Sequence, residues 1–321
     1  MRYVLAVDIG GTKCSVAIVD RKGHIVSRRT VPVDVSSPLA PVRQIVQLTR
    51  DFGKGARPKQ CFAAAGIAVP GLVRRNGTVW APNLPDWKQM PLASSLKRTF
   101  GIPVVVESDR NAALLGECWH GVARGRSDVI VLMIGTGIGA GIMSGGRVIR
   151  GAHELSGCAG WLSVSIAKDT ESSTTGELES IMAGPGIANA ARKRLQEGQK
   201  SSLSQYAASK VTAHEVAAAA RHGDQMALDI FHRAGRLLGV GVANMVSLFD
   251  PEVVIIGGGM AGAADLYFDS LRDAMLKGAQ PLAAREVRLA VSKLGDRANL
   301  LGCARLAWQS LETRKSKKER R

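Results

Sequence analysis

The residues from Val4 to Asp20 read VLAVDIGGTKCSVAIVD, and they decide which folds the chain can adopt. Two apolar, β-branched runs flank a double glycine. Both runs are too short for helices, so we expect two strands joined by a tight turn. Paired glycines let backbone N–H groups approach a ligand closely and form a concavity that holds anions. The turn therefore suits phosphates, although an ordinary hairpin with a glycine turn explains the same residues equally well.

Polar side chains around this turn favour the phosphate interpretation. Gly10 and Gly11 form the turn, Thr12 adds a hydroxyl donor and Lys13 adds a cation. Asp8 is an acid suited to holding a water of a Mg²⁺ ion. The chain contains no GxxxxGK[ST] sequence, so these residues do not belong to a P-loop protein.

Two further glycine clusters each follow an apolar run of strand type. Loops at the strand ends of an α/β sheet are where ligands bind. The third cluster also fits GxGxxG, but Gln280 and Pro281 stand where a dinucleotide-binding protein needs an acid, so a dehydrogenase is disfavoured. Three separate glycine loops around one nucleotide fit better. The residues of the second and third loops are Gly135, Thr136, Gly137 and Gly139, and Gly257, Gly258 and Gly259.

Composition places the chain among soluble globular proteins. It has 321 residues, 45% hydrophobic and 22% charged, which allows two domains with well-formed cores. No apolar run reaches the ~18 residues of a membrane span, and we expect no signal peptide and no membrane partner. The cysteines are scattered and odd in number, which favours reduced thiols in the cytoplasm. The formal charge of +16 suggests attraction to polyanions, part of it through a basic tail at 313–321 that we expect to be disordered.

Seven motifs occur along the chain in the order that one protein family shows, and together they are more specific than any one of them. The chain resembles the ROK family of sugar kinases, within the ASKHA (actin-like ATPase and sugar kinase) superfamily, over nearly its whole length. The resemblance implies an α/β fold of two domains around a central cleft, with ATP and Mg²⁺ as cofactors and a homodimer as the assembly. It divides the chain into a small lobe of 1–115 plus 297–312 and a large lobe of 116–296. The motifs are DIGGTK, GIAVPGLV, APNLPDW, VESDRN, IGTGIGAGI, GAHELSGCAGW and IIGGGMAG.

The resemblance also implies roles for single residues. Asp109 matches the catalytic base that takes the proton of the sugar 6-hydroxyl, although it also suits a helix cap. Asn83 matches a sugar contact, although a turn-forming asparagine is the alternative, and Lys13 could point to solvent instead of to phosphate. The implied substrate-binding residues are Gly71, Asn83, Ser108, Asp109, Cys158, Trp161 and Glu179.

The chain departs from the family pattern in its substrate segment. Typical members have Glu-Ile-Gly-His where Cys158 to Trp161 read CAGW, and they supply three zinc-binding cysteines where 168–176 has none. Zinc needs about four nitrogen or sulfur ligands, so we expect no zinc. Trp161 either stacks on a sugar or fills the volume of the missing histidine, His153 is expected to be structural, and Ser108 replaces the usual asparagine.

These departures leave the function with alternatives. Phosphorylation of glucose at the 6-hydroxyl is the default, and fructose or an N-acyl hexosamine is another possible substrate. A non-catalytic regulator that binds sugar or nucleotide is a further alternative, which the retained Asp8 and Asp109 argue against. Family repressors carry an N-terminal helix-turn-helix that we do not expect before Val4, so sequence-specific binding of nucleic acid is not expected.

Overall fold

The computed structural model describes residues 3–52, 61–165 and 175–319, and the chain forms two compact units. The first unit comprises residues 1–125, 148–156 and 296–321, and the second comprises 126–147 and 157–295. The first boundary lies later than the expected residue 115, because helix α4 (Asp109–His120) continues past that point. The sequence also gave no sign that residues 148–156 return to the first unit.

A five-stranded sheet forms the centre of the first unit. Its strands are β1 (Tyr3–Ile9), β2 (Lys13–Val19), β3 (Ile25–Pro32), β4 (Phe62–Val69) and β7 (Val104–Ser108), in the order β3-β2-β1-β4-β7. The first three strands pair antiparallel, whereas β1, β4 and β7 pair in parallel. A separate two-stranded hairpin around Asn76 and Gly77 is formed by β5 (Leu72–Val73) and β6 (Val79–Trp80).

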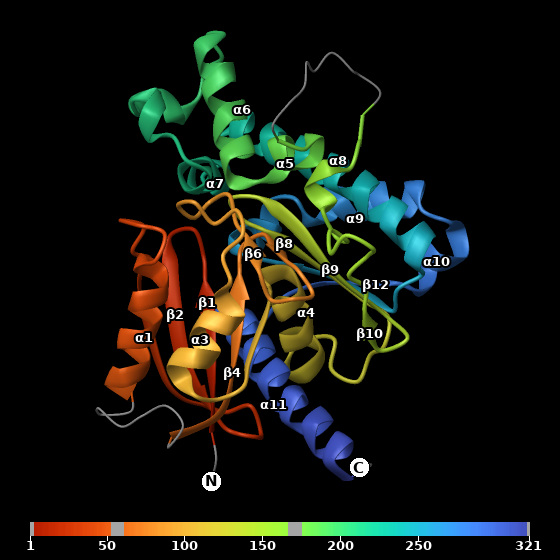
Figure 1. Cartoon of the computed structure of the whole chain (residues 1–321). Coiled ribbons are helices and arrows are strands. Elements are labelled where there is room, and N and C mark those ends of the chain that lie inside the picture. Colours follow the sequence, from red (N-terminus) through yellow and green to blue (C-terminus); the bar gives the residue numbers. More distant parts are fainter. Residues whose placement is uncertain (1–2, 53–60, 166–174, 320–321) are drawn as a thin grey trace. The chain divides into compact units, whose positions relative to one another are not determined.

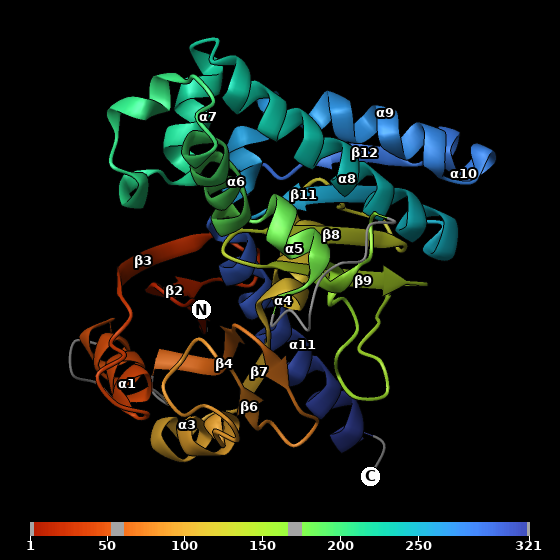
Figure 2. The ribbon, with the colours of Figure 1, turned by 90° about the horizontal axis from the view of Figure 1, so that it is seen from above.

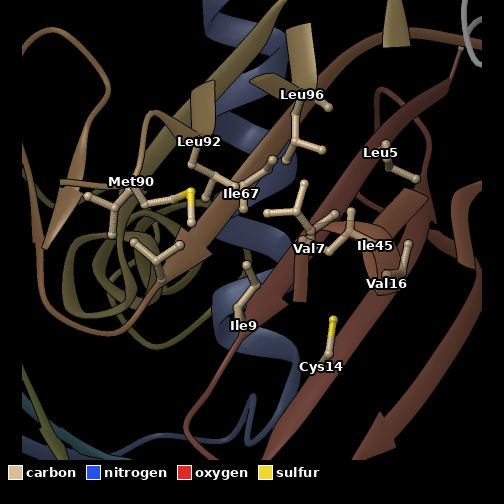
Figure 3. Close-up of a cluster of buried hydrophobic side chains, with 14 of the residues drawn as sticks. Leu5, Val7, Ile9, Cys14, Val16, Ile45, Ile67, Met90, Leu92 and Leu96 are labelled. Carbon is tan, nitrogen blue, oxygen red and sulfur yellow. The ribbon is translucent and has the colours of Figure 1, made fainter. Parts of the chain in front are cut away.

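Helices cover both faces of this sheet because its strands are apolar on both sides. Leu5, Val7 and Ile9 share one core cluster with residues of α1 (Ala40–Phe52) and α3 (Leu92–Phe100), as Figure 3 shows. Val4 and Ala6 point to the opposite face and pack with α4 and α11 (Arg297–Glu319). Alternation of side chains along β1 thus serves two cores at once.

Helix α11 lies very close to its neighbours in the first unit, beside α4 (Figure 1). A Cβ on Gly302 would lie 1.7 Å from the carbonyl oxygen of Ala112, so only glycine fits there. The helix continues to Glu319, where the sequence predicted a disordered tail from residue 313. Lysine, arginine and glutamate are good helix formers, so a helix already packed up to Trp308 can extend into a charged segment.

The second unit is built on another five-stranded sheet. Its order is β10-β9-β8-β11-β12, with β8 (Val129–Ile134), β9 (Ile138–Ser144), β10 (Arg147–Val148), β11 (Val253–Gly257) and β12 (Arg288–Val291). Strands β8 and β9 pair antiparallel, whereas β8, β11 and β12 pair in parallel. The helices are α5 (Glu177–Met182), α6 (Gly184–Gln196), α7 (Ala213–Arg221), α8 (Gln225–Phe249), α9 (Phe268–Gly278) and α10 (Pro281–Glu286), with 3-10 turns at Ala159–Trp161, Ser202–Gln205, Ala208–Lys210 and Gly259–Leu266.

The long helix α8 has clear signals at both ends. The Asp224 side chain accepts a hydrogen bond from the Ala227 N–H (3.0 Å), which caps the first turn. Asp250 ends the helix in a left-handed conformation (φ 44°), and its N–H donates to the Val246 carbonyl. Helices α8 and α9 lie side by side along the sheet (Figure 2).

Within the described residues, no helix combines the length and the apolar composition that a membrane crossing requires.

Candidate functional site

The first glycine turn joins β1 to β2, as the sequence predicted. The ladder ends at the pair Ile9 and Cys14, and the Gly10 N–H donates to the Lys13 carbonyl (2.8 Å) to close the turn. Gly11, Thr12 and Lys13 are exposed. A short turn with an exposed glycine, hydroxyl and ammonium group can receive an anion such as a phosphate.

Asp8 lies one residue before the end of β1 and is half-buried. The Asn299 side-chain amide of α11 donates to its Oδ1 atom (3.1 Å). Burial raises the pKa of Asp8 to about 7; the Asn299 hydrogen bond lowers this pKa and the charge of Asp109 raises it. The two carboxylates therefore lie within electrostatic range of each other. No sequence pattern predicts the role of Asn299, because its contact with Asp8 joins opposite ends of the chain.

Asp109 is the first residue of α4, directly after β7. Its Oδ1 accepts a hydrogen bond from the Arg110 N–H (2.8 Å), while the N-cap position of the helix belongs to Ser108 and not to Asp109. Burial raises its pKa, while hydrogen bonding to the backbone of Arg110 opposes the rise. Ser108 is 3% exposed, and its hydroxyl lies 3.5 Å from an oxygen of Glu107.

Two residues predicted to contact sugar lie in neighbouring loops of the first unit. Gly71 has φ 106°, and a Cβ there would lie 2.3 Å from the Trp80 carbonyl oxygen, so the position requires glycine. Asn83 is exposed in a turn closed by the Leu84 N–H and the Ala81 carbonyl (3.0 Å). A Cβ on Gly11 would lie 3.8 Å from the Asn83 Cβ, so this turn adjoins the first glycine turn.

The second and third glycine loops meet at one cavity of the second unit. The Gly135 N–H donates to the Gly137 carbonyl (2.9 Å) in the β8–β9 turn, and the Gly184 N–H donates to the Gly135 carbonyl (2.8 Å). The cavity has a volume of about 280 Å³. Its lining residues are Gly135, Thr136, Gly184, Pro185, Gly259 and Met260.

Not every predicted glycine of these loops lines the cavity. Gly139 and Gly257 lie in strands β9 and β11. Gly258 has φ 80°, and a Cβ there would lie 2.4 Å from the Ile134 carbonyl oxygen, so it holds the third loop against β8. The sequence missed Gly184 and Pro185 at the start of α6, although a proline in the first helical turn is a recognisable start signal.

Glu179 lies in α5 of the second unit, against the second glycine loop. The Glu179 Oε2 atom accepts a hydrogen bond from the Ile138 N–H (2.7 Å), and a Cβ on Gly160 would lie 2.9 Å from the Glu179 Cβ. Cys158 and His153 are exposed. Trp161 is 61% exposed, so it does not fill an interior volume, and its stacking on a sugar stays a prediction.

The described residues contain no group of three or more histidine, cysteine or acidic side chains that could hold a metal. The loop at 168–176, which the sequence predicted to lack zinc ligands, lies mostly outside the described residues. The expectation that the protein binds no zinc therefore stays a prediction.

Comparison with known proteins identifies the family. The model of the ROK family matches residues 4–310. The glucokinase of Streptomyces coelicolor is 33% identical over 316 residues, which cover 96% of this chain and 98% of that protein. The glucokinase of Thermotoga maritima is 34% identical over 307 residues, which cover 94% and 96%.

A solved structure of similar sequence agrees with this result. A ROK family glucokinase from Streptomyces griseus, in complex with glucose and AMPPNP, has a TM-score of 0.77 and 32% sequence identity. The match covers 96% of this chain and 99% of that one. The α/β, actin-like ATPase fold predicted from the glycine loops is thus confirmed, and the chain belongs to the ROK family.

Proposed function

We propose that this ROK-family, ATP-dependent sugar kinase transfers the γ-phosphoryl group of ATP to the 6-hydroxyl of a hexose, with glucose as the default substrate. The observation that supports this most directly is the placement of Asp109, half-buried at the start of α4 and within electrostatic range of Asp8. The names of the similar glucokinases favour glucose.

Asp109 is the proposed general base. A carboxylate whose pKa is raised by burial accepts a proton more readily than a solvated one, as long as it is ionised at the working pH. In phosphoryl transfer the acceptor oxygen loses its proton to such a group while the enzyme aligns it with the phosphorus. Asp109 therefore orients the hydroxyl and then holds its proton on the carboxylate.

The residues around Asp8 fit a hydrated magnesium ion. Two half-buried carboxylates in one neighbourhood repel each other, and a divalent cation offsets that repulsion. Asp8 would hold Mg²⁺ through water, with Thr12 and Lys13 beside the phosphates. When bound, Mg²⁺ neutralises charge on the β- and γ-phosphates of ATP.

The cavity of the second unit is the proposed place of the nucleotide. Glycines on its wall leave room for a planar base or a ribose. The exposed glycine turn of the first unit would take the terminal phosphates.

The sugar contacts are proposed from the substrate-binding residues that the family resemblance implies. In the first unit Gly71 and Asn83 would contact ring hydroxyls, and in the second unit Glu179 would do so with the carboxylate oxygen that does not accept from Ile138. A different hexose, such as fructose or an N-acyl hexosamine, is the second candidate. Exposed Cys158 and Trp161 favour it, because a thiol and an indole are poor partners for hydroxyls.

A coupled assay of ADP release across a panel of hexoses tests the proposal. We expect turnover with ATP, Mg²⁺ and at least one hexose, and we expect the product to carry phosphate on the 6-hydroxyl. No turnover with any sugar, together with intact sugar binding, would favour the non-catalytic regulator instead.

The substitution Asp109→Asn tests the role of the base. We expect kcat to fall by about 10²- to 10⁴-fold, the range of general-base catalysis, while the KM values stay within a few-fold. The matched control is Asp273→Asn, which removes an exposed carboxylate in α9 and should leave kcat unchanged. A variant Asp109→Asn that keeps more than about a tenth of kcat contradicts the assignment.

A further inference from the structure

Residues 148–156 form a strap that belongs to the first unit, although the chain before and after it belongs to the second. Two ion pairs hold the strap to that unit. Arg150 pairs with Glu107 at the end of β7, and Glu154 pairs with Arg75 in the β5–β6 turn (2.8 Å). Only the first of these pairs reaches the residues next to Asp109.

The pair of Arg150 and Glu107 has the geometry of a strong, charge-assisted interaction. The Arg150 Nη2 and Nε atoms donate to the Glu107 Oε2 atom at 2.6 and 3.1 Å. Glu107 is 7% exposed. A buried carboxylate needs a cation and hydrogen bonds to offset the cost of taking its charge out of water, and Arg150 supplies both to Glu107.

The second oxygen of Glu107 holds the junction from which Asp109 projects. Its Oε1 atom accepts hydrogen bonds from the Ser108 N–H and from the Asn111 side-chain amide, both at 3.0 Å. These contacts fall on both sides of Asp109 in the sequence. They therefore fix where β7 ends and how α4 begins, and with that the direction of the Asp109 carboxylate.

We propose that Arg150 is a positioning residue for Asp109 and acts through Glu107. The inference rests on the proposed role of Asp109 as the base. Arg150 holds one oxygen of Glu107, the other oxygen holds the β7–α4 junction, and the junction aims Asp109 at the acceptor hydroxyl. A catalytic group displaced by about 1 Å costs on the order of 10²-fold in rate, so loss of the contact between Arg150 and Glu107 should lower the rate of phosphoryl transfer.

The first experiment compares the two ion pairs of the strap. Arg150→Gln should lower kcat by about 10- to 100-fold and leave the KM for ATP within about twofold. Arg75→Gln removes the other pair, whose arginine side chain is 82% exposed, and should leave kcat within about twofold of wild type. Equal losses in both variants would overturn the proposal, because the strap would then act only as an anchor.

The second experiment asks whether Arg150 works through Asp109. In the Asp109→Asn background, Arg150→Gln should lower the residual single-turnover rate by less than about twofold, because residues that act as a unit are non-additive. If it lowers that rate by the same factor as in wild type, Arg150 acts on something else and the proposal fails.

A conservative variant covers the case in which Arg150→Gln does not fold. Arg150→Lys keeps the charge but lacks the planar fork of the guanidinium, from which Nε and Nη2 both reach Glu107, so we expect kcat between those of wild type and Arg150→Gln. Wild-type kcat in Arg150→Lys, or in Glu107→Gln, would overturn the proposal. Full activity in Asp109→Asn would instead refute the base itself, which separates the two failures.

Discussion

The two central sheets of this protein are built to one plan. In each, an antiparallel pair joined by a glycine turn comes first, a third antiparallel strand extends it, and two parallel strands complete the other side. The turn after β1 ends at the pair Ile9 and Cys14, and the turn after β8 ends at Ile134 and Ile138.

The side chains placed on these sheets differ sharply. One residue before the turn, β1 carries Asp8 opposite Ser15, whereas β8 carries Met133 opposite Gly139. The second parallel strand of the first unit leads into Asp109, whereas β12 ends at Val291. The shared frame thus places the glycine turns alike, and the side chains on it differ: the first sheet carries the carboxylates of the proposed base and metal site, and the second carries apolar residues and glycines at the matching positions.

The largest effect should come from the substrate segment of the second unit, which lacks two strong polar groups of the family pattern. We expect a glucose KM in the millimolar range or above, with weak discrimination among epimers. The double substitution of Cys158→Glu and Trp161→His should raise kcat/KM for glucose. Each restored contact is worth about 1–3 kcal/mol, so the gain could reach about 10²- to 10⁴-fold. A micromolar glucose KM with strict epimer selectivity in the native protein would contradict this.

The next prediction concerns Asp8, whose matching position in β8 is the apolar Met133. In the folded protein the pKa of Asp8 is raised from 3.8 to about 7, so between these pH values the folded chain binds a proton that the unfolded chain releases. The protonated group stabilises the fold fully below about pH 4, and this contribution is lost as the pH rises to about 7.

The substitution Asp8→Asn should therefore change stability in a pH-dependent way. Without Mg²⁺, the free energy of unfolding of the variant minus that of wild type should increase from pH 4 to pH 7.5, by at most about 4 kcal/mol. Denaturant titrations at several pH values measure the difference. A difference that does not change with pH means that Asp8 is ordinarily solvated, and millimolar Mg²⁺ should reduce the difference if Asp8 holds its hydration shell.

The features that could be predicted from the sequence are those whose pattern lies within a short segment of the chain. The glycine turn between β1 and β2 and the position of Asp109 at the start of a helix depend on residues close together in the chain, and the structure has both as expected. Asn299 beside Asp8, Arg150 beside Glu107 and Gly184 beside Gly135 are contacts between distant segments. No local pattern predicts them, because the fold alone brings these segments together.

Two expected boundaries differ from the structure: the end of the small lobe and the start of the disordered tail. The small lobe was expected to end at residue 115, whereas the first unit continues to residue 125, past the end of α4 at His120. The disordered tail was inferred from charge alone, whereas the packing of the preceding turns of α11 supports a helix through Glu319.

The smallest effect compares two adjacent glycines of the third loop. Gly258→Ala puts a side chain at φ 80° and 2.4 Å from the Ile134 carbonyl, whereas a Cβ on Gly259 meets no atom within 4 Å. We expect Gly258→Ala to cost about 1–3 kcal/mol of stability and to raise the KM for ATP about tenfold. Gly259→Ala should change the melting temperature little. Thermal melts with and without ATP distinguish the two, and equal behaviour would mean that the third loop is not held against β8.

The position of α11 has a consequence for the order in which the protein matures on the ribosome. Synthesis proceeds from the N-terminus, and small domains generally fold as they emerge. The face of the first sheet that carries Val4 and Ala6 is covered by Leu300 and Cys303 of α11, which are made only after the whole second unit. The second unit can therefore finish folding first, while that face of the first sheet still lacks the part of its core that α11 supplies. Asn299, the hydrogen-bond partner of Asp8, lies in the first turn of the same helix, so a nascent chain lacks this contact until synthesis reaches α11.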